Sequence, residues 1–369
     1  MPRVILAGGG TGGHLYPMLA IADALVQAGL PAHNIRLVGS SRGEDRRILS
    51  GSPFRVSLWP GRGIRRSVSL GAIFANVRAL FGITGAFALG VVTALTWRPS
   101  VVVSVGGYAS LPMSIGAVIT RRPLILVELD AATGLAHRLV LRFATKRCTA
   151  FEDIDPRAIV TGAPVRQELV KNVLGEPIGE VSIPTLTAPA ADSQTVVLAM
   201  TGSLGARSVN DAVAELARLW RDRRDVVLIQ VTGRRDFGRI KEQAESAALD
   251  YRIVEFADMT ILWPLADVAI CRAGATTVAE LGVVGVPAIL VPLPHSPSNH
   301  QEENARAVAA VGAAMVIDDS LVSGASLAAS LEPLLQSPRR TKMASAMKSL
   351  GRPHAARDIA TVVLEVANL

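Results

Sequence analysis

Two glycine-rich segments carry the clearest chemistry in this sequence. Residues 8–13 run directly into His14, and residues 202–205 include Ser203. Each segment stands between an apolar run and a helical pattern. Glycines allow a tight turn and let a ligand approach the backbone closely. The N-terminus of the following helix offers unpaired N–H groups and partial positive charge. Both segments therefore predict sites for phosphate groups.

His14 is the residue of the first segment with acid–base chemistry. It would stand at the start of a helix, where a neutral imidazole can take a proton from a sugar hydroxyl. A histidine that only caps the helix is the plainer alternative. The same segment also fits G-x-G-x-x-G, a dinucleotide fingerprint. An NAD site would have an acidic residue at the end of the second strand. That strand instead leads to Arg42, which suits the 2′-phosphate of NADP. An NADP-dependent oxidoreductase therefore remains an alternative.

Other polar residues follow apolar runs in the second half. Glu280 falls on the helix after a strand and a small-residue turn, and one carboxylate can accept hydrogen bonds from two ribose hydroxyls. Gln301 and Asn304 lie three apart, on one face of a later helix, and amides suit the recognition of sugar hydroxyls. Residues 153–155 spell Asp-Ile-Asp, a metal–nucleotide pattern in other transferases. Because this triplet precedes a proline in an expected loop, we expect no metal site and no cofactor.

Alternating strands and helices must position these residues. In the first half, strands are expected at 4–7, 35–38, 55–58, 101–104, 124–127 and 158–160, and helices at 15–28, 70–97, 110–120 and 133–143. In the second half, strands are expected at 196–200, 226–231, 252–255, 268–271, 288–291 and 314–317. Such alternation predicts parallel sheets covered on both faces. We expect an N-terminal domain over 1–170, a linker over 171–194, a C-terminal domain over 195–350, and a helix over 351–369 that packs back on the N-terminal domain.

Charge and composition narrow the partners. Residues 1–165 hold 18 Lys and Arg against 8 Asp and Glu, whereas residues 166–369 hold 20 against 23. A basic first half suggests an anionic partner such as phosphate or a lipid surface. Aromatic residues make up only 4%, which argues against base stacking and nucleic acid. Cys148 and Cys271 are expected to be buried thiols in a reducing compartment.

One uncharged segment competes as a membrane span. Residues 79–97 are flanked by Arg78 and Arg98 and approach the length that crosses a bilayer. Several glycines and threonines interrupt them, and a strand pattern follows at once. We therefore expect a helix buried in the domain with one face on the membrane. Basic residues precede it at Arg62, Arg65 and Arg66.

Taken together, the motifs resemble the MurG family of N-acetylglucosamine transferases, and the resemblance covers nearly the whole chain. The segments that carry it are residues 9–14, 106–108, 162–166, 202–206, 272–275 with Glu280, and 299–301 with Asn304. It implies a GT-B fold, in which two Rossmann-like, doubly wound parallel-sheet domains face a central cleft. It also implies an inverting glycosyltransferase that moves N-acetylglucosamine from UDP-N-acetylglucosamine to the 4-hydroxyl of the muramyl sugar of lipid I, forming lipid II.

The resemblance also implies roles for individual residues. In the first half, Thr11, Gly12 and Gly13 would lie against the donor and acceptor phosphates. In the second half, the uracil would lie near Ala257, the ribose at Glu280 and the sugar at Gln301. The other residues expected to contact the donor are Arg166, Ser203, Ala275, Thr276 and Asn304. His14 or Glu128 would take the proton of the attacking hydroxyl.

One stretch departs from the family pattern. The family carries His-Glu-Gln-Asn where this chain has Val127-Glu128-Leu129-Asp130. Glu128 is retained, but an ionised Asp130 cannot donate a hydrogen bond and brings negative charge near a diphosphate. This change leaves open a glycosyltransferase with another lipid acceptor, or a non-catalytic homologue that acts as a scaffold for cell-wall proteins. The implied location is the cytoplasmic side of the cell membrane, as a peripheral protein on the inner leaflet.

Overall fold

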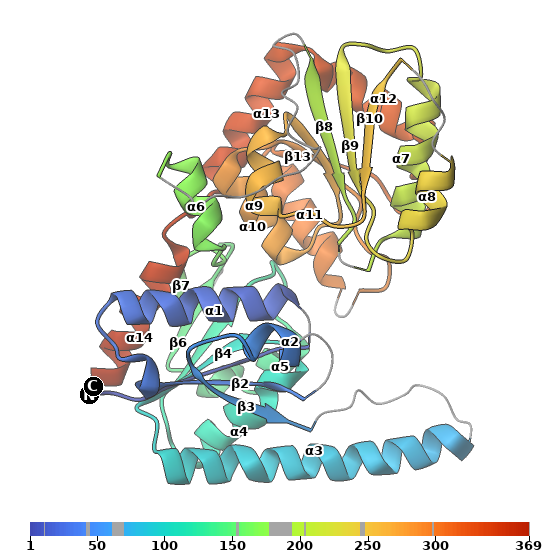
Figure 1. The fold of residues 1–369 in the computed structure, drawn as a ribbon. Coiled ribbons are helices and arrows are strands. Elements are labelled where there is room, and N and C mark those ends of the chain that lie inside the picture. Colours follow the sequence, from blue (N-terminus) through green and yellow to red (C-terminus); the bar gives the residue numbers. More distant parts are fainter. Residues whose placement is uncertain are drawn as a thin grey trace. The chain divides into compact units, whose positions relative to one another are not determined.

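The chain forms two compact units in this computed structural model (Figure 1). The structure describes residues 1–10, 12–41, 45–60, 70–152, 155–176, 194–202, 204–243, 248–296 and 299–368, without the side chains of residues 70–83 and 337. Unit 1 comprises Met1–Val165 and Pro353–Leu369, and unit 2 comprises Arg166–Arg352.

Unit 1 is built on a parallel sheet with the strand order β3-β2-β1-β4-β5-β6-β7. Its strands are β1 (Val4–Gly8), β2 (Ile35–Ser40), β3 (Arg55–Trp59), β4 (Val101–Gly106), β5 (Leu124–Glu128), β6 (Lys146–Thr149) and β7 (Ala158–Val160). Its helices are α1 (Gly12–Gln27), η1 (Ala32–Asn34), α2 (Asp45–Leu49), α3 (Leu70–Trp97), η2 (Tyr108–Ser110), α4 (Leu111–Ile119), α5 (Leu135–Arg138), η3 (Leu141–Phe143) and α14 (Ala355–Asn368).

Helices cover both faces of this sheet. Helices α1 and α14 lie together on one face of the sheet. Helix α4 lies on the other face, and α3 packs against α4 (Figure 1). The apolar strands explain this arrangement, because β1, β4 and β5 are buried along their whole length and need cover on both sides. The strand order reverses between β1 and β4. Ligands of doubly wound sheets bind beside such a reversal, at the carboxyl ends of the strands.

Unit 2 repeats the design with the strand order β10-β9-β8-β11-β12-β13, again all parallel. Its strands are β8 (Thr195–Met200), β9 (Val226–Val231), β10 (Asp250–Val254), β11 (Val268–Cys271), β12 (Ala288–Leu290) and β13 (Ala314–Val316). Its helices are α6 (Gln167–Val173), α7 (Arg207–Leu219), α8 (Phe237–Gln243), α9 (Met259–Leu262), η4 (Trp263–Leu265), α10 (Ala275–Val284), α11 (His300–Ala310), α12 (Gly324–Leu335) and α13 (Ser337–Ser349).

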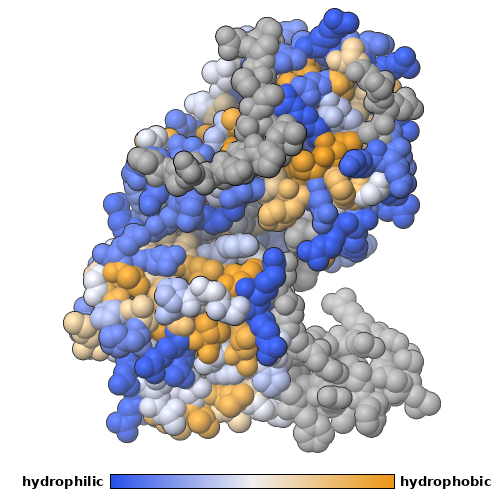
Figure 2. Space-filling view, viewed as in Figure 1, coloured by the Kyte–Doolittle hydropathy of each residue, from blue (hydrophilic) through white to orange (hydrophobic). Residues whose placement is uncertain are grey.

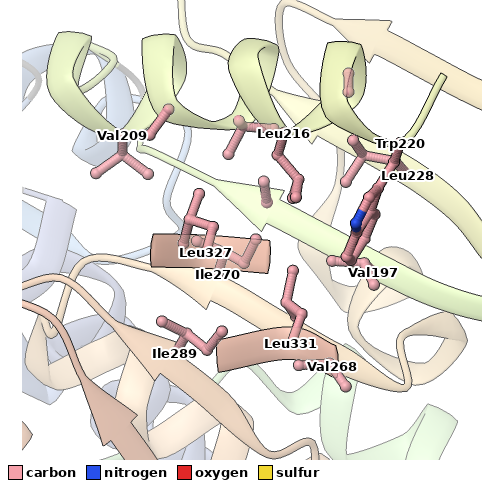
Figure 3. Close-up of a cluster of buried hydrophobic side chains, with 14 of the residues drawn as sticks. Val197, Val209, Leu216, Trp220, Leu228, Val268, Ile270, Ile289, Leu327 and Leu331 are labelled. Carbon is pink, nitrogen blue, oxygen red and sulfur yellow. The ribbon is translucent and has the colours of Figure 1, made fainter. Parts of the chain in front are cut away.

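The core of unit 2 lies between its sheet and helices α7 and α12 (Figure 3). Val209, Leu216 and Trp220 point from the α7 side toward strand residues such as Val268 and Ile270, and α12 closes the cluster with its own leucines. The periodicity of α7 accounts for this, because its apolar residues recur on one helical face. Burial of these side chains fixes where β8 ends and α7 begins, and hence the glycine loop between them.

The expected fold class is confirmed for each unit, and the expected strands are present. The prediction missed β6, whose sequence Lys-Arg-Cys-Thr lacks an apolar run. Within β6, Arg147 is buried because it pairs with Asp155. The continuous helix expected over 133–143 was wrong, since α5 and η3 are separate short pieces.

The boundaries between the units also differ from the expected ones. Residues 166–170 were assigned to the first domain, but they fold with unit 2. Asn172 on α6 donates a hydrogen bond to the backbone oxygen of Thr260, 2.9 Å away, and this contact ties α6 to unit 2. Most of the expected linker, residues 177–193, lies outside the described residues. At the other end of the chain, α14 packs on α1 in unit 1.

Helix α3 presents apolar residues to the surface along its described half. Leu89, Val92 and Leu95 are 39%, 53% and 56% exposed. Figure 2 shows apolar side chains mixed with polar ones along the edge of unit 1 where this half of α3 lies. Within the described part of the chain, no helix combines the length and apolar character needed to cross a bilayer.

Candidate functional site

The first glycine loop of unit 1 is held in place by hydrogen bonds to a buried carboxylate. Asp45 is fully buried at the start of α2, and its Oδ2 accepts a hydrogen bond from the Ser40 N–H at 2.8 Å. Its Oδ1 accepts one from the Gly10 N–H at 3.1 Å. The Tyr108 ring lies against Gly10, where an added Cβ would come within 2.7 Å of Cε1. The N–H of Gly10 is thus used inside the protein, where it helps to fix the loop that leads into α1.

His14 lies at the first turn of α1, half-buried, beside the end of β4. A Cβ added to Gly106 would come within 3.0 Å of the His14 Cδ2, and one added to Gly107 within 3.3 Å of its Nδ1. Both glycines have positive φ, at 97° and 76°. The close approach of an imidazole and a left-handed backbone together explain why glycine occupies these two positions. Gly12 and Gly13 open α1 beside His14, and Thr11 lies outside the described residues.

Glu128 ends β5 at the same edge of the sheet, and it is only 5% exposed. Its Oε2 lies 3.1 Å from the Nδ1 of His137, a residue that sequence reasoning did not single out. Asp130 follows in the loop and is half-buried. The structure therefore brings His14, Glu128 and Asp130 to the carboxyl-terminal edge of one sheet, as their positions after strands predict.

The second glycine loop, after β8 in unit 2, rests directly on the loop after β9. A Cβ added to Gly233 would lie 2.4 Å from the Gly205 nitrogen. Asn210 supports the loop from α7, because its Nδ2 donates to the Thr232 backbone oxygen at 2.9 Å and to Asp236 at 2.8 Å. Asn210 was not predicted, and a buried amide inside a helix gives no sequence signal of its own. Ser203 lies outside the described residues.

Glu280 lies on α10, but it is 5% exposed and both of its oxygens are engaged. Oε2 accepts a hydrogen bond from the Trp263 Nε1 at 2.9 Å, and Oε1 accepts from the Arg166 guanidinium at 3.2 Å. Arg166 also pairs with Asp258 at 3.1 Å. Burial raises the pKa of Glu280, and the neighbouring Arg166 opposes that shift. In this structure Glu280 anchors Arg166, and the ribose contact expected of Glu280 stays a prediction.

The two amides on α11 also differ in accessibility. Gln301 is half-buried, and its Oε1 accepts a hydrogen bond from the Leu293 N–H at 2.9 Å. Asn304 is fully buried, and its Nδ2 donates to the Ala273 backbone oxygen at 3.0 Å. Asn304 therefore holds the turn before α10, and the sugar contact expected of it stays a prediction.

The remaining expected donor contacts lie at exposed or half-buried turns of unit 2. Ala257 follows β10 and is half-buried beside Phe256, which is 74% exposed. Ala275 and Thr276 open α10 and are half-buried. All these positions follow the carboxyl ends of β10 and β11. Among the described residues, no group of three or more His, Cys, Asp or Glu side chains is arranged to hold a metal ion.

Comparison with known proteins agrees with this geometry over the full chain. Residues 4–149 match the glycosyltransferase family 28 N-terminal domain, and residues 196–361 match the family 28 C-terminal domain. A relative from Alkalilimnicola ehrlichii is 39% identical and covers 100% of this chain and 99% of its own. The chain belongs to the MurG family, within glycosyltransferase family 28. Members of this family are glycosyltransferases, and this protein is one.

A second relative carries the same name as the first. The Alkalilimnicola protein and a relative from Desulforudis audaxviator are both named UDP-N-acetylglucosamine–N-acetylmuramyl-(pentapeptide) pyrophosphoryl-undecaprenol N-acetylglucosamine transferase. The second relative is 35% identical and covers 99% of this chain and 98% of its own.

Two solved structures share the fold. The crystal structure of Acinetobacter baumannii MurG has a TM-score of 0.74 at 24% identity and covers 99% of this chain and all of its own. The glycosyltransferase VinC, solved with dTDP, has a TM-score of 0.69 at 16% identity, with 99% of both chains covered. At these identities the likeness shows the GT-B fold alone.

Proposed function

We propose that this protein transfers N-acetylglucosamine from UDP-N-acetylglucosamine to the 4-hydroxyl of the muramyl sugar of lipid I, forming lipid II. The observation that carries the proposal is similarity over the full length to relatives whose names state this donor and this acceptor. The same names do not favour another lipid acceptor. Retention of a histidine at the start of α1 and of a carboxylate at the end of β5 argues against a non-catalytic scaffold.

The reaction would be a single inverting displacement. The acceptor hydroxyl attacks the anomeric carbon, the bond from that carbon to the UDP oxygen breaks, and His14 takes the hydroxyl proton. This role for His14 is supported by Gly106 and Gly107, which admit its ring to the edge of the sheet. UDP leaves with a growing negative charge, which the turn after β8 and the start of α7 would stabilise. No metal or cofactor is required in this scheme.

The donor would bind unit 2. Its diphosphate would lie on the glycine loop after β8, where Ser203 is expected, and its uracil near Ala257. The sugar would meet Gln301, whose Nε2 would donate to a hydroxyl while its Oε1 accepts from the Leu293 N–H. Arg166 would contact the donor from its place beside Glu280 and Asp258.

A transfer assay tests the proposal. Purified protein would be incubated with radiolabelled UDP-N-acetylglucosamine and a lipid I analogue, and the labelled disaccharide lipid would be measured. Removal of a general base typically costs roughly 10²- to 10⁴-fold in kcat, and we expect such a loss in His14→Ala. His33→Ala is the matched control, because His33 is exposed and lies before β2. Asp130→Asn, run alongside, reports whether the changed residue after β5 limits the wild-type rate.

The outcomes distinguish transfer to lipid I from a different acceptor and from a non-catalytic scaffold. Transfer by the wild type that is lost in His14→Ala and kept in His33→Ala supports the proposal. Absence of transfer from wild type and Asp130→Asn, with the donor still bound, would indicate a different acceptor. Transfer by Asp130→Asn but not by the wild type would indicate a degenerate site and favour a non-catalytic scaffold.

We further propose that unit 1 docks on the inner leaflet of the cell membrane as a peripheral protein. The support is the exposed apolar face of α3 at Leu89, Val92 and Leu95, with the exposed Arg98 directly after the helix. An apolar helical face beside basic residues suits the surface of an anionic bilayer. The basic residues Arg62, Arg65 and Arg66 lie outside the described part of the chain.

Sedimentation with vesicles tests the docking. We expect binding to phosphatidylglycerol vesicles to fall when Leu89, Val92 and Leu95 are all changed to Ser. Changing the exposed leucines of unit 2, Leu219, Leu265 and Leu321, to Ser is the matched control and should leave binding unchanged. Equal binding by the α3 variant and the wild type would disprove the docking face.

A further inference from the structure

Three polar side chains of unit 1 form a buried hydrogen-bonded chain. His137 on α5 lies between Ser104 on β4 and Glu128 on β5, and the three residues are 2%, 0% and 5% exposed. The His137 Nε2 lies 2.8 Å from the Ser104 Oγ, and its Nδ1 lies 3.1 Å from the Glu128 Oε2. Three elements are therefore linked through a single imidazole.

The chemistry of the carboxylate sets the direction of these bonds. An ionised Glu128 can only accept, so the hydrogen on its bond with His137 belongs to Nδ1. A neutral His137 then accepts the Ser104 hydroxyl hydrogen at Nε2, and the imidazole holds one tautomer and one ring orientation. Burial of a carboxylate without such a donor would be costly.

The order of Ser, His and Glu is that of a hydrolase triad, but this serine is not a nucleophile. Ser104 has no exposed surface and lies within β4 among buried residues. A carbonyl carbon cannot approach its Oγ. The serine end of the chain of bonds is therefore structural, and any function must lie at the Glu128 end.

The other oxygen of Glu128 is a buried acceptor. Oε1 is buried and unsatisfied among the residues that the structure describes. A buried acceptor left unpaired costs about 1–3 kcal/mol, and in native proteins such an atom calls for an explanation, of which a role at a substrate site is one. Glu128 ends β5 at the sheet edge that also carries Gly106. A Cβ added to Gly106 would lie 3.0 Å from the His14 ring and 3.7 Å from the His137 ring.

We infer that His137 and Ser104 are positioning residues for Glu128. They hold its Oε2, and Oε1 is thereby kept for a hydroxyl or amide N–H of the acceptor substrate beside His14. Glu128 then orients the acceptor, and His137 acts only through Glu128. This inference rests on the proposed function and adds two residues that the motifs did not mark.

Two substitutions at His137 separate its two bonds. The amide nitrogen of Asn falls close to the place of Nδ1, so His137→Asn retains a donor for Glu128. The amide of Gln reaches the place of Nε2, so His137→Gln retains the contact with Ser104 and loses that with Glu128. We expect kcat of His137→Asn to stay within about 3-fold of wild type. We expect kcat of His137→Gln and Glu128→Gln to fall by roughly 10- to 100-fold, as when outer partners that orient a functional group are lost.

For each variant, kcat, the KM for UDP-N-acetylglucosamine and the thermal stability are measured separately. KM for UDP-N-acetylglucosamine should stay unchanged in all variants, because the donor is assigned to unit 2. Ser114→Ala is the control for loss of a buried hydroxyl, since the Ser114 Oγ donates to the Ser110 backbone oxygen, directly before α4. It should keep full kcat.

Equal kcat for His137→Asn and His137→Gln, or losses of kcat that simply follow the loss of thermal stability, would overturn the inference while the proposed function stands. Absence of transfer by the wild-type protein would overturn the proposed function, and the inference with it.

Discussion

Glu280 is a buried carboxylate whose protonation is coupled to folding. Desolvation raises its pKa above the ordinary value of 4.5, and Arg166 and Trp263 offset only part of this shift. The folded chain therefore binds a proton at Glu280 more tightly than the unfolded chain does. Consequently this group favours the folded state most at low pH, and that contribution is lost as pH rises from 4.5 through the folded-state pKa.

We expect Glu280→Gln to remove this pH dependence, because the amide does not ionise. The Tm difference, variant minus wild type, should become more positive as pH rises from about 4 to about 7. Thermal unfolding over a pH series measures it. Asp222→Asn is the control for loss of a carboxylate, since Asp222 is 90% exposed, and its Tm difference should stay flat. Parallel curves for Glu280→Gln and wild type would contradict the prediction.

At the scale of elements, α3 and α4 cross at two glycines. A Cβ added to Gly90 would lie 2.2 Å from the Pro112 backbone oxygen, and one added to Gly116 would lie 2.5 Å from the backbone of Gly90. The helices therefore touch through their backbones. This close crossing places α3 against α4 and leaves the opposite side of α3 at the surface.

We expect Gly90→Ala and Gly116→Ala each to lower the free energy of unfolding by about 1–3 kcal/mol, because the added methyl group has no room. Denaturant unfolding measures this change. Gly85→Ala is the matched control on α3, where an added Cβ meets nothing within 4 Å. It should raise stability by about 0.5–1 kcal/mol, the helix-interior advantage of alanine over glycine. A neutral Gly90→Ala would show that the helices do not cross this closely.

At the scale of the whole molecule, unit 1 is completed by the far end of the chain. The chain leaves unit 1 at Val165 and re-enters it at Pro353. Helix α14 then packs on α1 and contacts β4, and its Ile359 is fully buried. The site in unit 1 thus depends on a helix that is encoded after all of unit 2.

We expect Ile359→Ala to destabilise unit 1 by about 2–5 kcal/mol, the range for truncation of a buried isoleucine. Hydrogen exchange should quicken at the amides of β1 and β4 and stay unchanged in unit 2. Thr361→Ala is the control on the exposed face of α14. Equal quickening in both units would mean that they unfold as one body, against the division described above.

The local sequence determined most of the secondary structure and the place of the site. Strand–helix alternation, glycine loops and apolar periodicity act over a few residues, so they can be interpreted without tertiary information. They predicted the two parallel sheets, and they predicted His14 at the start of a helix that follows a strand. The motifs in their order also predicted the family, which the relatives confirm.

Tertiary structure alone decided which polar residues are buried by partners and which of them support the loops and strand ends. Glu280 and Asn304 looked accessible in the sequence, yet long-range partners bury both. Asp45 and His137 belong to no motif. Asp45 nevertheless holds the first glycine loop, and His137 bonds to Glu128. The inner strand β6 escaped prediction because it has no apolar run, and its Arg147 is buried beside its partner Asp155. Burial and pairing join residues far apart in the chain, and no local pattern records those contacts.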